Sequence, residues 1–163
     1  MYAKGEAVVY PMHGAGIIEG FEAKIIDGVN RNYCILYIPL GNIRIMLCED
    51  SIQNTKLRKI MPQGDIARIM KKVAKLPPCT NQDSWSERYK DNMERIKTGK
   101  LIETASVFHG LYQREKKKGL SSAEKKVLST AKKILLSEIM LSYNVEKTEA
   151  EEILEKFFNK VAA

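Results

Sequence analysis

The sequence predicts an α+β protein of two small domains, a curled antiparallel β-sheet over residues 1–61 and an all-α domain over residues 62–163. Short runs of β-branched residues separated by turn residues occupy the first part. After Pro62, apolar residues recur instead at helical spacing. A chain of 163 residues can form two such domains, and its hydrophobic content of 44% predicts that it folds.

The first domain is expected to contain four or five short strands. Asp27 and Gly28 both tolerate positive φ, so they predict a hairpin turn, and a second turn is expected around Gly14. A sheet this small curls so that few edges stay exposed, which favours a small barrel of SH3 or Tudor type. The expected strands cover residues 6–11, 16–26, 33–38 and 43–47.

The last of these strands alternates in character. Ile43, Ile45 and Leu47 fall on one face and are expected in the core, while Arg44 and Met46 fall on the other. The strand is therefore expected to be half-buried.

The second domain is expected to contain four or five helices. Ser121 and Glu124 form a capping box, in which each side chain binds the backbone N–H of the other residue at a helix start. Asp83 or Ser84 could cap a helix that Gly99 closes. Helical periodicity is expected at residues 66–73, 85–97, 102–118, 121–139 and 153–161.

The formal charge of +7 is concentrated in the middle of the chain. Residues 61–143 contain 17 basic and 9 acidic side chains, a net of +8, whereas residues 1–60 carry +1 and residues 144–163 carry −2. A concentrated positive field favours a polyanionic partner such as nucleic acid. The alternative is a lysine-rich helical surface that is simply solvated.

Residues suited to catalysis or metal binding are few. The histidines are His13 and His109, and no phosphate-binding loop or nucleophile motif is present, so neither an enzyme nor a cofactor or metal site is expected. Cys34, Cys48 and Cys79 are too widely spaced for a metal or redox pair. No secretion signal or membrane span is recognisable, so we expect a cytoplasmic protein.

The one tryptophan of the chain stands at the expected start of a helix, beside basic residues. Trp85 and Arg88 are three residues apart and share a helix face, and Lys90 is close by. Trp85 could pack in the core, or it could project as a wedge between base pairs while cations hold phosphates. Tyr89 is the better candidate for the core among these two aromatic residues.

Several motifs in this order resemble the CarD/CdnL family of bacterial transcription regulators. They are residues 5–11 (GEAVVYP), followed by His13 and Gly14, then residues 85–90 (WSERYK) and residues 119–125 (GLSSAEK), with Ala131 and Glu138 at the family's spacing. The resemblance covers nearly the whole chain.

The resemblance implies that the N-terminal barrel binds the β subunit of RNA polymerase by strand addition. Met46 departs from some relatives, which carry Arg at this position, so an apolar contact would replace an ionic one there. The residues implied in polymerase binding are Lys24, Ile43, Arg44, Ile45, Met46 and Leu47.

The resemblance also implies that the helical domain binds promoter DNA in the minor groove at the upstream edge of the transcription bubble. Trp85 would be the wedge, and Arg88 and Lys90 would hold the neighbouring phosphates. Glu87, where relatives often carry Arg, should weaken DNA binding. Lys125, Lys126 and Lys132 either extend this basic surface or form a solvated helix face.

The expected mechanism is a longer-lived open promoter complex, produced by a monomer without cofactor. Two other classes of protein stay open from the residues alone. One is a protein-interaction module in which Trp85 is a core residue, and the other is an architectural DNA-binding protein that acts without polymerase. An enzyme is the weakest alternative.

Overall fold

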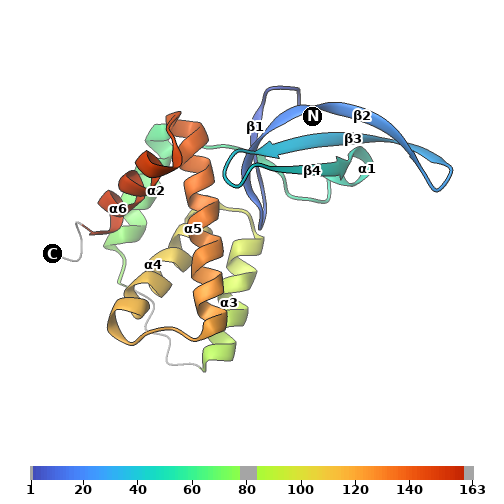
Figure 1. The fold of residues 1–163 in the computed structure, drawn as a ribbon. Coiled ribbons are helices and arrows are strands. Elements are labelled where there is room, and N and C mark those ends of the chain that lie inside the picture. Colours follow the sequence, from blue (N-terminus) through green and yellow to red (C-terminus); the bar gives the residue numbers. More distant parts are fainter. Residues whose placement is uncertain (1, 78–83, 160–163) are drawn as a thin grey trace.

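The computed structural model describes residues 2–77 and 84–159. The described chain forms a five-stranded antiparallel sheet followed by helices, which confirms the predicted fold class (Figure 1). The strand order is β4-β3-β2-β1-β5. The strands are β1 (Ala7–Tyr10), β2 (Gly14–Ile26), β3 (Val29–Ile38), β4 (Ile43–Cys48) and β5 (Arg58–Lys59).

The sheet is built around the long strands β2 and β3, which continue past their neighbours as a projecting hairpin (Figure 1). Asp27 (φ 54°) and Gly28 (φ 78°) form the turn of this hairpin, as predicted. No pairing joins β4 to β5 among the described residues, so each is an edge strand. The sheet is thus curled without being closed by hydrogen bonds.

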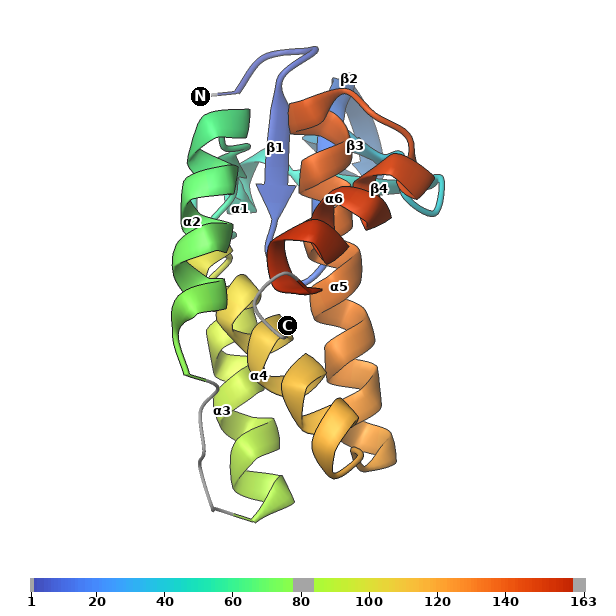
Figure 2. The same cartoon turned by 90° about the vertical axis from the view of Figure 1, so that its left-hand side faces the viewer.

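The helices pack beside the sheet, and the molecule as a whole has the form of an L (Figure 1). In the view of Figure 2 the helices face the reader and the β2–β3 hairpin points away. Helix α5, the longest at 22 residues, contacts α3, α4, α6 and strand β2. The helices are α1 (Glu49–Ile52), α2 (Gln63–Lys75), α3 (Trp85–Lys97), α4 (Leu101–Lys117), α5 (Ser122–Tyr143) and α6 (Lys147–Asn159).

Two separate hydrophobic clusters lie inside the molecule. The first, between the helices, gathers apolar side chains from α2 to α6, and the second lies within the sheet. The sheet cluster does not include every residue expected there. Leu47 is buried, but Ile43 at the start of the same strand is 49% exposed, because β4 enters the core only toward its end.

The helix starts agree with the predicted caps. Ser84 accepts a hydrogen bond from the backbone N–H of Glu87 at 3.4 Å, and Ser121 accepts one from the N–H of Glu124 at 3.2 Å. The alternative cap Asp83, and with it Cys79, lies outside the described residues.

The sheet and the helices meet directly at the turn between β1 and β2. The N–H of Ala15 donates to the hydroxyl of Ser137 on α5 at 2.8 Å. Gly14 has a φ of 112°, and a Cβ atom at this position would lie 2.7 Å from the same hydroxyl oxygen. The turn can approach α5 this closely only because residue 14 has no side chain.

We expect Gly14→Ala to lower the free energy of unfolding by about 2 kcal/mol, because it adds a clash to a backbone conformation that L-residues avoid. Urea denaturation measures the change. The matched control is Gly110→Ala in α4, where a Cβ meets open space. That substitution should stabilise the protein by about 0.5–1 kcal/mol. Equal effects of the two substitutions would contradict the close contact.

Candidate functional surfaces

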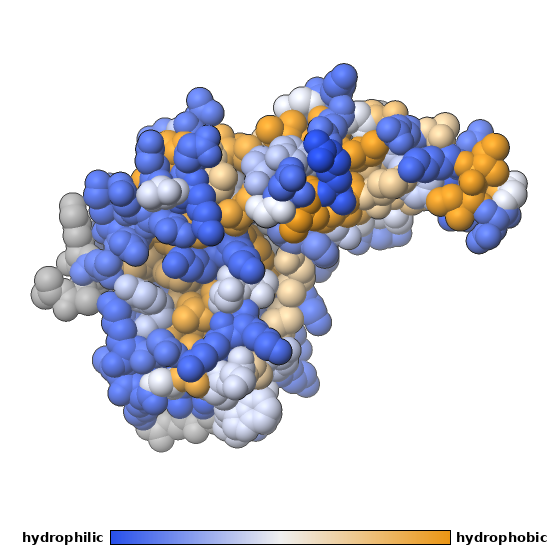
Figure 3. Space-filling view, in the orientation of Figure 1, coloured by the Kyte–Doolittle hydropathy of each residue, from blue (hydrophilic) through white to orange (hydrophobic). Residues whose placement is uncertain are grey.

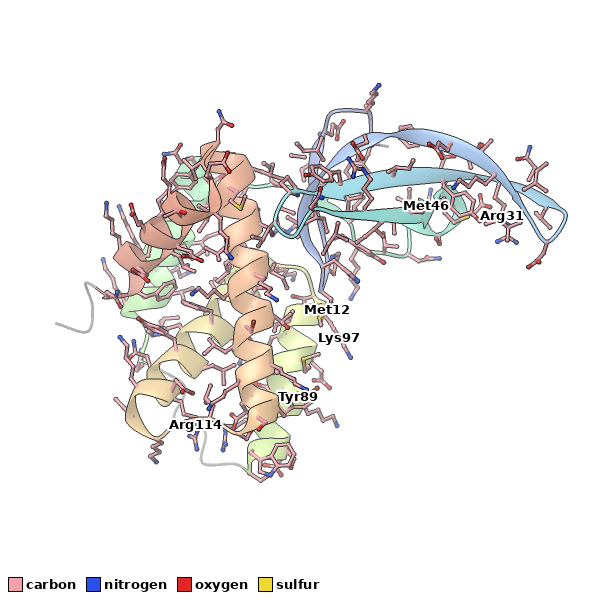
Figure 4. All side chains as sticks on the ribbon, viewed as in Figure 1. Met12, Arg31, Met46, Tyr89, Lys97 and Arg114 are labelled. Atoms are coloured by element: carbon pink, nitrogen blue, oxygen red, sulfur yellow. The ribbon has the colours of Figure 1, made fainter. Side chains whose placement is uncertain are left out.

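Trp85 is an exposed residue at the end of the helical domain most distant from the sheet. It is the first residue of α3, and 54% of its surface is accessible. The sequence left open whether Trp85 lies in the core or on the surface, and in the structure it lies on the surface. Tyr89 lies one turn further along α3 and is 37% exposed, so it is the less exposed of the two aromatic residues, as predicted, but it does not belong to the core (Figure 4).

Lysines gather at the same end of the molecule. The first turns of α3 and α5 lie next to each other, and Lys90, Lys125 and Lys126 are exposed within the first two turns of these helices. Lys132 is different, because it is partly buried and lines a small hollow with Glu155 of α6. The structure thus brings three of the four predicted lysines to the end that carries Trp85.

Arg88 points into the protein, where it holds α3 to the start of α5. Its Nε and Nη2 atoms each donate to a carboxylate oxygen of Glu124 at 3.1 Å. The side chain of Arg88 is 15% exposed and that of Glu124 is 2% exposed. The family resemblance implied that Arg88 holds a DNA phosphate. In the structure its guanidinium binds a buried carboxylate.

Glu124 is charged in this environment. Burial alone would raise the pKa of its carboxyl group, but the hydrogen bonds and charge of Arg88, the Ser121 hydroxyl and the charge of Arg114 outweigh it. The pKa of Glu124 consequently lies below its ordinary value. The predicted capping box is only half realised. The N–H of Glu124 binds Ser121, but its carboxylate serves Arg88 and the Ser121 hydroxyl.

A second buried ion pair joins the sheet to the helices. Arg58 on β5 donates from Nη1 and Nη2 to the carboxylate of Glu138 on α5, at 2.8 and 2.7 Å. The N–H of Met61 donates to the same carboxylate at 2.8 Å. Glu138 is 1% exposed, and these three donors compensate for the loss of its water. Neither partner was predicted to be functional, and only the spacing of Glu138 had drawn attention to it.

The edge strand β4 presents a mixed surface. Met46 is 41% exposed, and the ammonium of Lys24 lies 3.6 Å from its sulfur. Arg44 is exposed but already engaged, because Glu19 accepts from its Nε at 2.7 Å and its guanidinium lies 4.6 Å from the centre of the Tyr37 ring. The outer backbone edge of β4 has no neighbouring strand in the described structure.

Two residues predicted to bind polymerase are not exposed. Leu47 is 5% accessible and belongs to the sheet core, and Ile45 is partly buried against that core. Their side chains support the strand from inside, so only their backbone groups could take part in strand addition. Ile43, Arg44 and Met46 carry the exposed side chains of β4.

Sequence reasoning missed an apolar surface at the end of the β2–β3 hairpin (Figure 3). Ile25 is 74% exposed, and Ile26 and Val29 are 49% and 47% exposed. Adjacent isoleucines in a strand point to opposite faces, so Ile25 and Ile26 cannot both be covered by a one-sided core. Two adjacent isoleucines were therefore the feature of the sequence that could have predicted this exposed apolar surface.

The sheet domain also has a hollow of about 870 Å³ beside α1, lined in part by Tyr2, Phe21 and Cys34. Burial, and to a smaller extent the carboxylate of Glu49, raises the pKa of the Cys34 thiol. A thiol whose pKa is raised is a poor nucleophile at neutral pH. Among the described residues, no cluster of metal-binding side chains and no helix able to span a membrane occurs.

Residues 2–61 match the family model described as CarD-like/TRCF RID domain, and residues 63–155 match the model described as CarD, C-terminal domain. The chain belongs to the CarD family. It is also 34% identical over 139 residues to the putative transcription factor YdeB of Bacillus subtilis. The aligned stretch covers 85% of this chain and 90% of YdeB. The resemblance noted in the sequence is confirmed, and both comparisons support a transcription regulator.

Glu124 gives this CarD-family protein a specific dependence on pH. The pKa of a carboxyl group is about 4.3 in an unfolded chain, and that of folded Glu124 is lower. Its contribution to stability is therefore complete above that unfolded value and is lost as the pH falls through the folded pKa. We expect Glu124→Gln to lower the free energy of unfolding at neutral pH by about 2 kcal/mol, because Arg88 loses the buried carboxylate that accepts hydrogen bonds from its Nε and Nη2 atoms.

The same variant should lose less additional stability on acidification than the wild-type protein, as urea titrations at neutral and acid pH would measure. Glu115→Gln is the control, because Glu115 is exposed on α4. If Glu124→Gln and Glu115→Gln gave the same stability at neutral pH, the buried pair would contribute nothing.

Proposed function

We propose that this CarD-family protein binds the β subunit of RNA polymerase through its sheet and promoter DNA through the far end of its helical domain, and thereby prolongs the open promoter complex. The observation that carries the proposal is the exposure of Trp85, which is 54% accessible and begins α3 at the end of the helices away from the sheet (Figure 1). An exposed aromatic ring at a helix start, close to solvated lysines, has the chemistry of a side chain that inserts between base steps while cations hold the phosphates.

The DNA-binding surface consists of Trp85 with the exposed lysines Lys90, Lys125 and Lys126. The indole inserts at the base step opened at the upstream edge of the bubble, and the ammonium groups lie against phosphates on either side. Unstacking a step costs about a few kcal/mol, and a wedge that fills the gap opposes its closure. Glu87, exposed one turn from the phosphate-binding lysines, limits the affinity for DNA.

The polymerase-binding surface is the free edge of β4 with the side chains next to it. An extended strand of the β subunit pairs with the β4 backbone, and Ile43 and Met46 supply apolar contact. Lys24 beside Met46 and the apolar end of the hairpin extend this surface. Arg44 is already paired with Glu19, so it contacts polymerase either after polymerase displaces Glu19 or together with Glu19 as an intact ion pair.

Attachment to polymerase explains how a weak DNA contact can be effective. The sheet bound at a promoter raises the local concentration of the helical domain at the upstream fork, so the DNA surface needs little affinity of its own. A monomer carrying both surfaces is sufficient for this mechanism, which requires neither nucleotide nor metal.

We expect wild-type protein to lengthen the lifetime of open complexes formed by a cognate bacterial polymerase, and Trp85→Ala to abolish most of this increase. A wedge contributing only 1.4 kcal/mol would change the lifetime by about tenfold. Lifetimes are measured by challenging preformed complexes with a competitor and following the loss of open DNA.

The matched control is Leu76→Ala, which removes a comparably exposed apolar side chain, 49% accessible, from another part of the helical domain. It should leave the lifetime unchanged. If wild-type and Trp85→Ala proteins gave the same lifetime while both bound polymerase, the wedge would be excluded, and a protein-interaction module would become the better description.

Met46→Asp should weaken polymerase binding by at least about tenfold, because it places a charge in the apolar contact beside the strand edge. Binding of the full chain to purified polymerase can be followed by fluorescence anisotropy. Leu76→Asp introduces the same charge at a similarly exposed position and should bind normally. Equal binding by the two variants would exclude the apolar contact at β4. Failure of the wild-type protein to bind polymerase would favour an architectural DNA-binding protein that acts without it.

A further inference from the structure

Helix α5 carries two buried glutamates, each paired with an arginine from another element. Glu124 in its first turn binds Arg88 of α3, and Glu138 near its other end binds Arg58 of β5. The two carboxylates are 14 residues apart, which corresponds to about 21 Å along a helix. α5 therefore spans most of the distance from the sheet to the end that carries Trp85 (Figure 1).

Arg58 connects three elements at one point. Its backbone belongs to β5, which pairs with β1, so it is fixed to the sheet. Its guanidinium binds Glu138 of α5, and its Nε also donates at 2.7 Å to the carbonyl of Gly99, two residues after the end of α3. A single side chain thus ties the sheet to α5 and to the end of the helix on which Trp85 stands.

The opposite end of α3 is held in the same manner. Arg88 lies one turn after Trp85, and its ion pair with Glu124 fixes that turn to the start of α5. α3 is therefore attached at both ends to α5, once directly and once through Arg58. A planar guanidinium group that donates from two nitrogens to one carboxylate restrains direction as well as distance.

We propose that Arg58 and Arg88 are positioning residues that hold Trp85 at a fixed distance and orientation from the polymerase-binding sheet. This inference rests on the proposed function and assigns Arg88 a role other than phosphate binding. It makes the effect on the open complex depend on the junction between the domains as much as on the two binding surfaces.

The physical reason is preorganisation. A wedge on a loosely attached domain would sample many orientations, and each binding event would have to restrict them at an entropic cost. A domain held rigidly presents the indole to the upstream fork in one orientation as soon as the sheet is bound. The effective concentration then depends on the fit of this geometry to the promoter complex.

The first test is the double variant Arg58→Met with Glu138→Gln. Removing the charges of both residues avoids leaving a single buried charge without its partner. The amide oxygen of Gln at position 138 can still accept a hydrogen bond from the N–H of Met61. Circular dichroism verifies that the variant is folded at the assay temperature. We expect normal binding to polymerase and normal affinity for duplex DNA, but an open-complex lifetime close to that with Trp85→Ala.

The geometry is measured separately, by pulsed electron spin resonance between labels on noncanonical residues at Asn30 of the hairpin and Ser129 of α5, both exposed positions. The wild-type protein should give one narrow distance distribution, and the double variant a broader one. Arg58→Lys retains a charge for Glu138 but not the planar two-donor geometry, so it should restore part of both the narrow distribution and the lifetime.

The second test separates positioning from phosphate binding at Arg88. Arg88→Met with Glu124→Gln leaves the net charge unchanged, whereas Lys90→Met removes one exposed charge. Lys90→Met should reduce the slope of log affinity for DNA against log salt by about one, as the loss of a phosphate contact does. The Arg88 variant should keep the wild-type slope and still fail to prolong the open complex.

A double variant at Arg58 and Glu138 that keeps the narrow distance distribution, or that loosens the domains yet still prolongs the open complex, overturns the inference. A reduced salt slope for the Arg88 variant overturns the role given to that residue. If wild-type protein itself had no effect on the open complex, the proposed function would fail, and the distance measurements would still decide whether the arginines fix the two domains.

Discussion

The structure depends most on the buried carboxylate of Glu138. A charge that is 1% exposed would be strongly destabilising by itself, and it is tolerated because two guanidinium nitrogens and one backbone N–H donate to it. The donors come from the last strand of the sheet and from the segment that leads into α2. Glu138 can be satisfied only when sheet and helices are assembled together, so one carboxylate couples the folding of the two hydrophobic clusters.

The two candidate surfaces follow from opposite physical conditions. At the sheet, an edge strand with unpaired backbone groups is available for a partner strand, and its exposed side chains are apolar or already paired. At the far end of the helices, an exposed aromatic ring stands among solvated lysines. The first surface suits a protein and the second suits nucleic acid, because phosphates attract cations and base steps accept a flat apolar group.

Local rules predicted the parts of this fold that local sequence determines. The Asp27–Gly28 turn, the serine caps and the change to helical periodicity after Pro62 all require only near neighbours. Local rules do not give direction. Spacing along a helix gives a shared face but not which element that face meets, so it could not reveal that Arg88 binds Glu124 or that Tyr89 lies outside the core. The partner of Arg88 is 36 residues away and that of Arg58 is 80 residues away, so no local pattern could reveal them.

The interval between the two glutamates of α5 also limits how such a protein can change in evolution. One residue inserted between them would rotate one carboxylate relative to the other by about 100° and move it by about 1.5 Å. One of the two ion pairs, Arg58 with Glu138 or Arg88 with Glu124, would then be broken. A change in the length of α5 between the two glutamates would therefore require compensating changes in β5 and α3. Insertions at the exposed hairpin turn carry no such requirement, and variation in chain length among proteins of this architecture should accumulate there.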